Sequence, residues 1–541
     1  MVRLQQIKLK IPHTDRQLYE KVCKLLCVDK EALISCKITR RSLDARKKPE
    51  LFYVYTVEAE LKQEAAVKKK TKNKNILFIE KEAPYCAVPA GTQALPCRPV
   101  IIGTGPAGLF CGYQLARLGY RPILLERGAD VENRIKDVEN FWNTGCLDAN
   151  SNVQFGEGGA GTFSDGKLNT LVRDSSGRNA EVLRIFHKFG APKEILYDSK
   201  PHIGTDILCG IVENMRREII DCGGEVHFHT CVEDFETLAE SDGTQRLTAL
   251  WLTDTLTKER RMLQTSLAVL AIGHSARDTF LNLHKRGVRM QAKSFAVGVR
   301  MEHPQDFINE SQYGKNYSTL PAATYKLTAK AADHRGVYTF CMCPGGYVVN
   351  ASSENGRLAV NGMSYSRRDG TNANSAVIVT VTPHDFGLEH PLAGMEFQRK
   401  LEEAAYLEGN GKIPVQLFED YCKNRASTGG KNIRPQMKGS YAWANVRRIF
   451  PETIALGIEQ GILQFNQKIK GYARGDAVLS GVESRTSSPV RILRDESFQS
   501  SIRGLYPCGE GAGYAGGITS AAIDGLKVTE SIIQTWRPFD K

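Results

Sequence analysis

Three glycines near residue 105 have the spacing of a turn that binds a diphosphate. Gly103, Gly105 and Gly108 follow the apolar run Val100–Ile102 and open a segment with helical character. Glycine permits the tight turn and lets main-chain N–H groups approach phosphate oxygens, while the helix N-terminus attracts the negative charge. Glu126 ends the next predicted strand, where its carboxylate can accept hydrogen bonds from ribose hydroxyls. This strand–turn–helix–strand pattern predicts a dinucleotide-binding unit of a parallel α/β sheet.

A second turn, close to the C-terminus, indicates which dinucleotide binds. Gly511, Gly513 and Gly516 follow the strand-like residues 505–508 and precede a predicted helix. Glu510 stands at the turn itself, where a carboxylate can hydrogen-bond the ribityl chain of a flavin. The N-terminus of the following helix can stabilise negative charge on the flavin ring. The turn therefore favours FAD over a nicotinamide dinucleotide.

A third glycine-rich segment, NVQFGEGGAGTFSDGKL, has the same spacing in a different context. No apolar strand precedes Gly156, so we do not expect a second dinucleotide turn here. The main chain around Gly158, Gly159 and Gly161 suits a loop that packs against a flat or anionic ligand. Lys167 can place a positive charge beside a phosphate or the reduced flavin. The alternative is an ordinary flexible loop.

Longer strings around these turns resemble known proteins. The segments GTGPAGLFCGYQLARLGYRPILLERG, LAVLAIGHSARDTF and LYPCGEGAGYAGGITSAAIDG together resemble the FAD-binding fold of the glutathione-reductase superfamily. The strings NVQFGEGGAGTFSDGKLNT, YTFCMCPGGYVVNASSENGRLAVNGMSYSRRDGTNANSA and GVESRTSSPVRI resemble, more narrowly, a family of FAD-dependent dehydrogenase-like proteins of bacteria and plant plastids. The resemblance spans essentially the whole chain.

The resemblance implies roles for residues at matching positions. The first turn would hold the pyrophosphate, Glu126 and Arg127 the adenosine end, and Val232 the adenine. The end of a central strand and the C-terminal turn would line the ribityl chain and the flavin ring. The residues that these roles assign to cofactor binding are Gly103, Gly105, Pro106, Ala107, Gly108, Glu126, Arg127, Val232, Ala271, Gly273, Gly509, Glu510 and Ile518. Glu510 stands where the superfamily usually has Asp.

Two features of the disulfide reductases in that superfamily are missing from the sequence. The cysteines nearest to the first turn, Cys111 and Cys146, do not form the redox-pair motif. There is also no second GxGxxG turn followed by a helix and by a strand that ends in an acid, which is the unit that binds NAD(P)H. We therefore expect neither thiol–disulfide chemistry nor a dedicated NAD(P)H domain, and NAD(P)H stays open as an electron donor.

No residue receives a catalytic role from the sequence, but several could reach the flavin. His274 follows the AIG turn and either approaches the flavin or caps a strand end. Cys341 and Cys343 fall on one face of a predicted strand, either as buried structural thiols or as a redox pair. Glu483 and Arg485 would share a face of an extended segment, as an ion pair or with the arginine binding an anion. The full set of candidates is His274, Cys341, Cys343, Tyr365, Arg367, Glu483 and Arg485.

The chain of 541 residues suits about two to four domains. We predict an α/β protein with a Rossmann-like FAD-binding domain, whose parallel sheet is doubly wound. An inserted α+β domain lies on the substrate side, and a small α/β domain precedes both. The predicted ranges are 1–90 for the small basic domain, 91–285 and 471–541 for the two parts of the FAD-binding domain, and 286–470 for the inserted domain.

Charge and cysteine usage limit the class of protein further. The net charge is +12, and residues 1–80 hold 19 Lys and Arg against 10 Asp and Glu. This basic segment leaves a nucleic-acid partner open, although such a stretch is more often a solvated face. The fourteen cysteines form no CxxC pairs, so we expect reduced thiols and no metal site. We find no signal peptide and no membrane-spanning apolar run, and therefore expect a soluble, cytoplasmic protein.

The sequence thus predicts an FAD-dependent oxidoreductase of dehydrogenase or reductase type, acting on a small molecule through a non-covalently bound flavin. The alternative is an FAD-containing RNA-binding or RNA-modifying protein. The substrate, the electron donor and acceptor, and the oligomeric state stay open.

Overall fold

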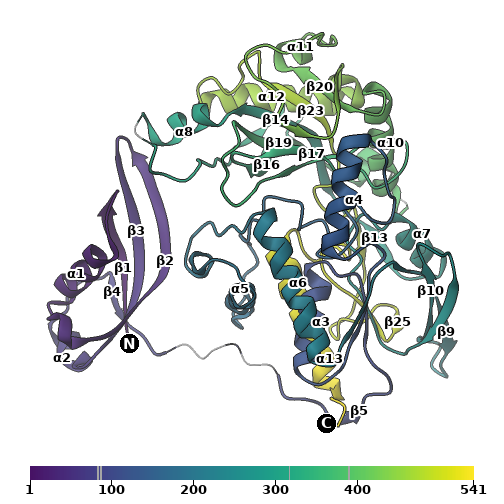
Figure 1. Ribbon diagram of the computed structural model, residues 1–541, viewed down its shortest axis with the longest axis horizontal. Helices are drawn as coiled ribbons and strands as arrows, with labels where there is room; N and C mark the ends of the chain where they lie inside the picture. The colour runs from purple at the N-terminus through teal and green to yellow at the C-terminus, as the bar shows by residue number, and fades with distance from the viewer. Residues whose placement is uncertain (82–84, 86–87, 316, 388–389, 541) are drawn as a thin grey trace.

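The computed structural model describes residues 1–81, 85, 88–315, 317–387 and 390–540. Figure 1 shows three parts: a small N-terminal unit at the left, a mixed domain at the top and a nucleotide-binding domain at the lower right. The termini of the chain lie near the lower edge of this view.

The nucleotide-binding domain is built on a five-stranded sheet. Its strands lie in the order β26 (Leu505–Pro507), β12 (Ala268–Leu270), β6 (Val100–Ile102), β7 (Ile123–Leu125) and β8 (Glu225–His227). All neighbours pair in parallel. Every residue of β26, β12 and β6 is buried, as expected for strands that are covered on both faces. The predicted α/β class with a parallel sheet is confirmed.

Helices cover one face of this sheet and a second sheet covers the other. Three helices, α3 (Pro106–Arg117), α6 (Thr205–Asp221) and α13 (Ile518–Thr535), pack side by side on the first face (Figure 1). The second face carries the antiparallel strands β9 (Thr230–Ala239), β10 (Gln245–Asp254) and β11 (Arg260–Gln264), with β25 (Ile502–Arg503) beside β10. Val100 and Ile102 of β6 share a hydrophobic core with Leu247 and Leu250 of β10.

The chain order of the strands creates a switch point beside β6. From β6 the chain continues to β7 on one side, and it later returns as β12 on the other side. Helix α3 leaves the carboxyl end of β6 and packs closely on it, because residue 108 is a glycine: a Cβ there would lie 1.9 Å from the carbonyl oxygen of Gly103. Ligands of open α/β sheets bind outside the carboxyl ends of strands at such a point.

The third domain contains a seven-stranded mixed sheet. Its order is β15 (Thr328–Lys330), β16 (Gly336–Cys343), β19 (Asn372–Val381), β14 (Phe295–Pro304), β23 (Val478–Glu483), β20 (Ile413–Leu417) and β22 (Tyr441–Trp443). A three-stranded sheet lies beside it, in the order β18 (Val360–Met363), β17 (Tyr347–Asn350) and β21 (Met437–Lys438). Helices α10 (Ala393–Glu408) and α12 (Glu452–Lys468) pack on the larger sheet. Strand β23 belongs to this sheet although it follows residue 470, the predicted end of the inserted domain.

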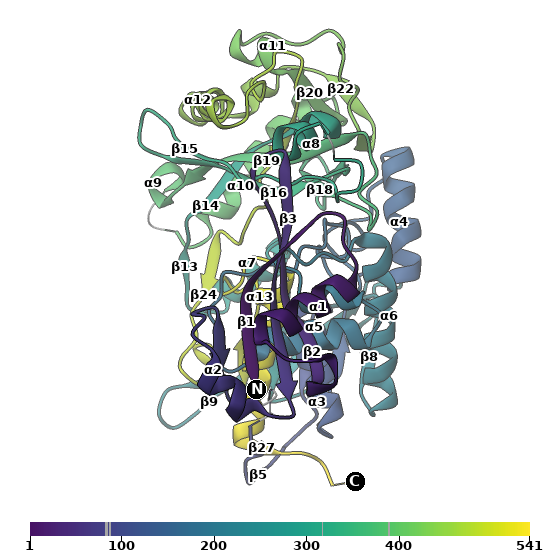
Figure 2. The same cartoon turned by 90° about the vertical axis from the view of Figure 1, so that its left-hand side faces the viewer.

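The N-terminal unit is a four-stranded sheet with two helices. Its strands are β2 (Leu33–Lys47), β3 (Glu50–Leu61), β1 (Val2–Lys10) and β4 (Ile76–Phe78) in spatial order, and its helices are α1 (Asp15–Leu26) and α2 (Glu64–Lys70). Arg41 of β2 forms two hydrogen bonds with Asp198, of 2.6 and 2.9 Å, and its main chain pairs with residues 197–199. The tip of the β2–β3 hairpin reaches α8 (Gln305–Tyr313), where Lys48 bonds the carbonyl oxygen of Ser311 (Figure 2).

The other elements connect these parts. The helices are α4 (Val131–Thr144), α5 (Arg178–Lys188), α7 (Arg277–Lys285), α9 (Pro383–Phe386) and α11 (Phe418–Cys422), and the short strands are β5 (Gln93–Ala94), β13 (Met290–Ala292), β24 (Val490–Ile492) and β27 (Trp536–Arg537). In the part of the chain that the structure describes, no helix is long and apolar enough to cross a membrane. The thirteen cysteines of that part are free thiols, and Cys86 lies outside the described residues.

One carboxylate of the large sheet is fully buried with incomplete pairing. Oε1 of Glu302 accepts hydrogen bonds from the Asn372 side chain at 3.0 Å and from the Gln436 main chain at 2.8 Å. Its Oε2 has no hydrogen bond among the described residues. Burial raises the pKa of Glu302 from 4.5 to about 7, although these hydrogen bonds oppose the shift.

Glu302 makes the stability of the fold depend on pH. Between pH 4.5 and about 7 the folded state holds a proton that the unfolded state has lost, so stability falls as the pH rises. We expect Glu302→Gln, which mimics the protonated form, to remove up to about 3 kcal/mol of that fall. Urea unfolding at pH 5 and pH 8 measures it. The exposed Glu310→Gln serves as control, and equal pH slopes in parent and E302Q would contradict the assignment.

Candidate functional site

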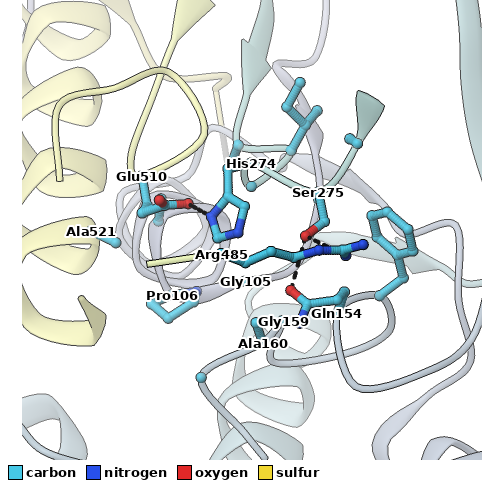
Figure 3. Close-up of a pocket in the computed structure, with 18 of the residues that line it drawn as sticks. Gly105, Pro106, Gln154, Gly159, Ala160, His274, Ser275, Arg485, Glu510 and Ala521 are labelled. Carbon is cyan, nitrogen blue, oxygen red and sulfur yellow. Dashed lines mark hydrogen bonds and ion pairs between the residues drawn. The ribbon is translucent and has the colours of Figure 1, made fainter. Parts of the chain in front are cut away.

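A large pocket lies at the switch point, outside the carboxyl ends of β6 and β12. It encloses about 1610 Å³ of non-protein space, part of it open to solvent. Its walls come from the turn after β6, the loop at residues 154–167, the turn after β12 and the turn before α13. The third domain closes the remaining side with residues of β16, β18 and β23. Figure 3 shows part of this lining, with segments from all over the nucleotide-binding domain meeting in one place.

The turn after β6 and the glycine-rich loop meet main chain against main chain. Helix α3 begins at Pro106, a residue whose fixed φ suits the first helical position, and Gly105 precedes it. A Cβ on Gly159 would lie only 2.9 Å from the Cα of Gly105. The first N–H groups of a helix have no acceptor inside the helix, so α3 presents free donors to the pocket. Its dipole favours an anion at the same place.

Glu126 ties three segments of this wall together. Its Oε2 accepts hydrogen bonds from the main chain of Thr104 at 3.0 Å and from the Thr104 hydroxyl at 2.8 Å. Its Oε1 accepts from the main chains of Gly128, at 3.1 Å, and Gly156, at 3.0 Å. The neighbouring Arg127 is held by Asp278 and by Cys231 and lies over the Phe155 ring, with its Nε free of hydrogen bonds among the described residues.

The glycine-rich loop is fixed in place by an arginine that the sequence did not single out. Arg134 of α4 is fully buried, and its guanidinium donates hydrogen bonds to the carbonyl oxygens of residues 152, 153, 156, 157 and 159. The loop therefore wraps around a cation, and the alternative of an ordinary flexible loop is wrong. Local sequence offered no signal for Arg134, because it stands among polar residues of a helix.

The turn before α13 carries a paired acid and imidazole. Nδ1 of His274 lies 2.7 Å from Oε2 of Glu510, whose Oε1 accepts a hydrogen bond of 2.8 Å from the main chain of Ser488 (Figure 3). Burial disfavours the Glu510 carboxylate, but the contacts with His274, the charge of Lys293 and the Ser488 hydrogen bond together outweigh it and keep the pKa of Glu510 below its ordinary value. Nε2 of His274 is buried with no hydrogen bond among the described residues. The N-terminus of α13, at Ile518, is the second helix N-terminus of the pocket.

Most residues predicted for cofactor binding come together in this pocket. Those that line it are Gly103, Gly105, Pro106, Ala107, Glu126, Arg127, Gly159, Gly161, Lys167, Val232, Ala271, Gly273, Glu510 and Ile518. Gly108, Gly158 and Gly509 stand behind the wall. Gly509 donates its N–H to Asp524 at 2.7 Å, and a Cβ on it would lie 2.6 Å from the Cβ of Ala107. Gly158 donates to the carbonyl oxygen of Thr104 at 3.0 Å.

The candidates for chemistry divide into two groups. His274, Cys341, Glu483 and Arg485 line the pocket, whereas Cys343, Tyr365 and Arg367 do not. The side chain of Cys341 is accessible from the pocket. Desolvation by the surrounding protein raises the pKa of its thiol to about 12, so the thiol is uncharged at neutral pH. Cys343 lies buried beside it, with its Sγ 3.4 Å from Nη2 of Arg300.

The expected ion pair between Glu483 and Arg485 is wrong, because each residue has another partner. Oε2 of Glu483 lies 3.4 Å from Nη1 of Arg300. Arg485 instead bonds both oxygens of Glu402, at 3.0 and 2.9 Å. The sequence could not show this, since Glu402 belongs to α10 and is 83 positions away.

Glu402 is the centre of a buried charge network that joins the two large domains. Both of its oxygens bond Arg277 of α7 at 2.8 Å, and one accepts from Ser484 at 2.6 Å. Arg485 continues the network to the Ser275 hydroxyl at 3.2 Å, and Ser275 donates to Gln154 at 2.9 Å in the wall of the pocket (Figure 3). Burial disfavours the Glu402 carboxylate, but the two arginines more than offset it and hold its pKa well below the ordinary value.

Breaking this network should destabilise the whole protein. Glu402→Gln leaves the buried guanidinium of Arg485 without a carboxylate partner, while Arg277 keeps its pair with Glu354; breaking a buried pair in this way typically costs about 3–5 kcal/mol. The contribution is present above pH 4.5 and is lost as the pH falls, because the folded-state pKa is lowered. Urea unfolding at pH 7 measures the loss. Glu396→Gln, on the exposed side of α10, is the matched control. If both variants unfold at the same urea concentration, Glu402 does not hold the domains together.

Comparison with known protein families identifies three segments of the chain. Residues 294–486 match the model described as "FAD-dependent protein, C-terminal domain-like". Residues 101–148 match an NAD(P)-binding Rossmann-like domain, and residues 1–60 match a domain of unknown function. The first of these segments contains the seven strands of the large sheet, and the second contains the turn after β6.

One relative that matches almost the whole chain places these segments in one family. An "uncharacterized protein" of Clostridium beijerinckii is 46% identical over 539 residues, which cover 98% of each chain. Among solved structures, the glycerol-3-phosphate dehydrogenase of Bacillus halodurans with FAD is 10% identical (TM-score 0.35), and the match covers 82% of this chain and 65% of that one, less than two thirds. A flavoprotein/dehydrogenase of Cytophaga hutchinsonii is also 10% identical (TM-score 0.32), with 80% and 76% covered. The chain belongs to the same family of FAD-dependent proteins as the Clostridium beijerinckii protein, and FAD is its cofactor.

Proposed function

We propose that this protein is an oxidoreductase that uses non-covalently bound FAD to oxidise or reduce a small molecule. The observation that carries the proposal is the single pocket between the nucleotide-binding domain and the third domain. Two helix N-termini and a glycine-rich loop line one part of it, and strands of another domain close the other part. A cofactor site alone would not need the second domain as a wall. The arrangement leaves a compartment for a substrate beside the flavin.

The residues of the first part fit the charge and shape of FAD. The N-terminus of α3, with Gly105 and Gly159, would hold the diphosphate through main-chain N–H groups. Arg127 and Val232 line the end that we assign to the adenosine. The unpartnered Nε2 of His274 and the N-terminus of α13 line the end that we assign to the ribityl chain and the flavin ring. We also assign the domain to the glutathione-reductase type that the sequence resembles.

The flavin supplies hydride or single-electron chemistry when bound. The third domain covers the substrate side of the pocket and reduces its exposure to water, and Glu483 provides an acid there. Burial raises the pKa of Glu483, which lines the pocket, and the contact with Arg300 only partly offsets this. A carboxyl group whose pKa is raised keeps its proton to a higher pH than a free one and can exchange that proton with a substrate.

The first test is the cofactor itself. Purified protein should show the visible absorbance of a flavin, release FAD into the filtrate after denaturation, and lose the visible absorbance on anaerobic titration with NADH, NADPH or a chemical reductant.

Gly105→Leu should abolish FAD binding while the protein stays folded. The backbone of Gly105 suits any residue (φ −68°), and a Cβ there meets only the Gly159 Cα, at 3.8 Å, so the added side chain projects into the pocket. Gly429→Leu, with open space around it, is the control. A colourless parent protein that takes up no FAD, or a G105L variant as yellow as the parent, would end the proposal.

A second proposal, binding of RNA, has one structural observation in its favour. A polar cleft between the β2–β3 hairpin and α8 is lined by Arg40, Arg46, Lys48 and Lys468, with Asp44 as the acid among its lining residues. Asp44 already bonds Arg46, at 2.8 Å. The surplus of positive charge suits a phosphate backbone.

Filter binding of labelled tRNA at low and high salt tests this second proposal. Retention should fall steeply as the salt concentration rises. It should also fall in the double variant Arg40→Ser and Lys48→Ser. The control is Lys72→Ser with Lys74→Ser, which removes the same charge from an exposed stretch of the same unit. No retention at low salt, or an equal loss in both double variants, rejects RNA binding through this cleft.

A further inference from the structure

The substrate side of the pocket contains a group of charged residues to which the proposed function assigns no ligand. Lys167, at the end of the glycine-rich loop, and Asp165 line the pocket there, beside Cys341 of β16 and Glu483 of β23. These residues come from one loop of the nucleotide-binding domain and two strands of the third domain, so the compartment is a feature of the whole fold and not a gap in a single loop.

One carboxylate in this compartment serves two cations. Oδ2 of Asp165 accepts a hydrogen bond of 2.6 Å from Nη2 of Arg368 and lies 3.3 Å from Nζ of Lys167. Lys200 lies outside the lining of the pocket, where it donates to the Thr324 hydroxyl at 2.8 Å. His202, on the same cluster, does not add a charge at neutral pH, because burial and then Arg368 lower its pKa to about 4. Two cations, Lys167 and Arg368, therefore stand against one carboxylate.

The other groups of the compartment do not cancel this excess. Glu483 and Arg300 are both buried and face each other at 3.4 Å, so the pair adds no net negative charge whether or not Glu483 holds its proton. Cys341 is an uncharged thiol. Lys167 donates to the carbonyl oxygen of Met342, yet about a third of its side chain stays exposed toward the pocket. Its ammonium group has three donors, so it retains capacity for an anionic ligand.

A second observation points to what the ligand must carry besides negative charge. Asp165 is 4% exposed, and its Oδ1 is buried with no hydrogen bond among the described residues. A buried carboxylate oxygen without a donor costs free energy, which a ligand with a hydroxyl or amino group would recover. The Lys167 ammonium, which can bind an anion, and Oδ1 of Asp165, which lacks a hydrogen-bond donor, belong to residues two positions apart in the same loop.

We propose that the substrate of this pocket is a small carboxylic acid with a hydroxyl or amino group beside its carboxylate, bound through Lys167 and Asp165. This inference rests on the proposed function for the presence of the flavin, and it names the chemical class that the flavin acts on. The carboxylate contacts the Lys167 ammonium, and the neighbouring O–H or N–H donates to Oδ1 of Asp165. Both contacts orient the carbon that bears the hydroxyl or amino group.

Titration calorimetry with three matched probes tests the proposal. Mandelate carries both the carboxylate and the hydroxyl, mandelamide lacks the charge, and phenylacetate lacks the hydroxyl. We expect mandelate to bind at least about tenfold more tightly than either of the others. Flavin content, measured separately from the visible spectrum, reports on the proposed function. A protein that binds FAD but shows no preference among the probes overturns this inference and leaves the proposed function standing. Binding of none of the probes overturns it as well.

Variants of the two residues separate charge from hydrogen bonding. Lys167→Met should weaken mandelate about tenfold or more and leave mandelamide unchanged, and Lys167→Arg should restore most of the loss. Lys136→Met, on the exposed side of α4, is the control for loss of a lysine. Asp165→Asn should remove the preference for mandelate over phenylacetate while FAD stays bound. If K167M binds mandelate as tightly as the parent, the anion lies elsewhere and the proposal fails.

Discussion

The buried contact of Glu402 with Arg277 and Arg485 is the constraint on which the rest of the architecture depends. Each arginine comes from a different segment, one at the start of α7 and one after β23, and the carboxylate comes from α10. A buried ion pair gains little net stability once desolvation is counted, but it fixes geometry when all of its hydrogen bonds are made. Here both oxygens of Glu402 are fully used. The third domain is thereby held at one position relative to the switch point. Arg485 also bonds Ser275, which in turn bonds Gln154, so it positions both residues in the pocket wall.

The parts of the site that follow from local pattern could be predicted from the sequence. The glycines of the turn after β6 serve contacts between residues within about six positions of each other. Glu126 ends β7, the next strand of the same unit. Spacing along the sequence was therefore enough to place Gly103, Gly105 and Glu126. The parts that depend on distant segments could not be predicted. Arg134, which fixes the glycine-rich loop, and Glu402, which takes Arg485 away from Glu483, contact residues that only the folded chain brings near.

Cys341 shows a second limit of pattern. Strand alternation placed Cys341 and Cys343 together, but the register of β16 against β19 shifts between Phe340 and Cys343, and Cys341 has a positive φ of 40°. Such a bulge re-aims a side chain, and bulges concentrate next to active sites. The result is one thiol that opens into the pocket and one that stays buried. The glycine pattern has a similar limit. Gly108 and Gly509 fit the cofactor-binding pattern, but they shape the wall of the pocket through close packing and do not line it.

The nucleotide-binding domain is completed by segments that are synthesised after the third domain. Strand β26 pairs with β12 and helix α13 packs on α3, yet both follow the whole third domain in sequence, and β27 then pairs with β5 near the start of the domain. During translation of the third domain, β6 and α3 have already emerged from the ribosome, but β26 and α13, which complete their sheet and helix layer, have not. The N-terminus of α13 cannot contribute to the pocket until α13 itself has been made. The site for FAD is therefore complete only after the whole third domain has been synthesised.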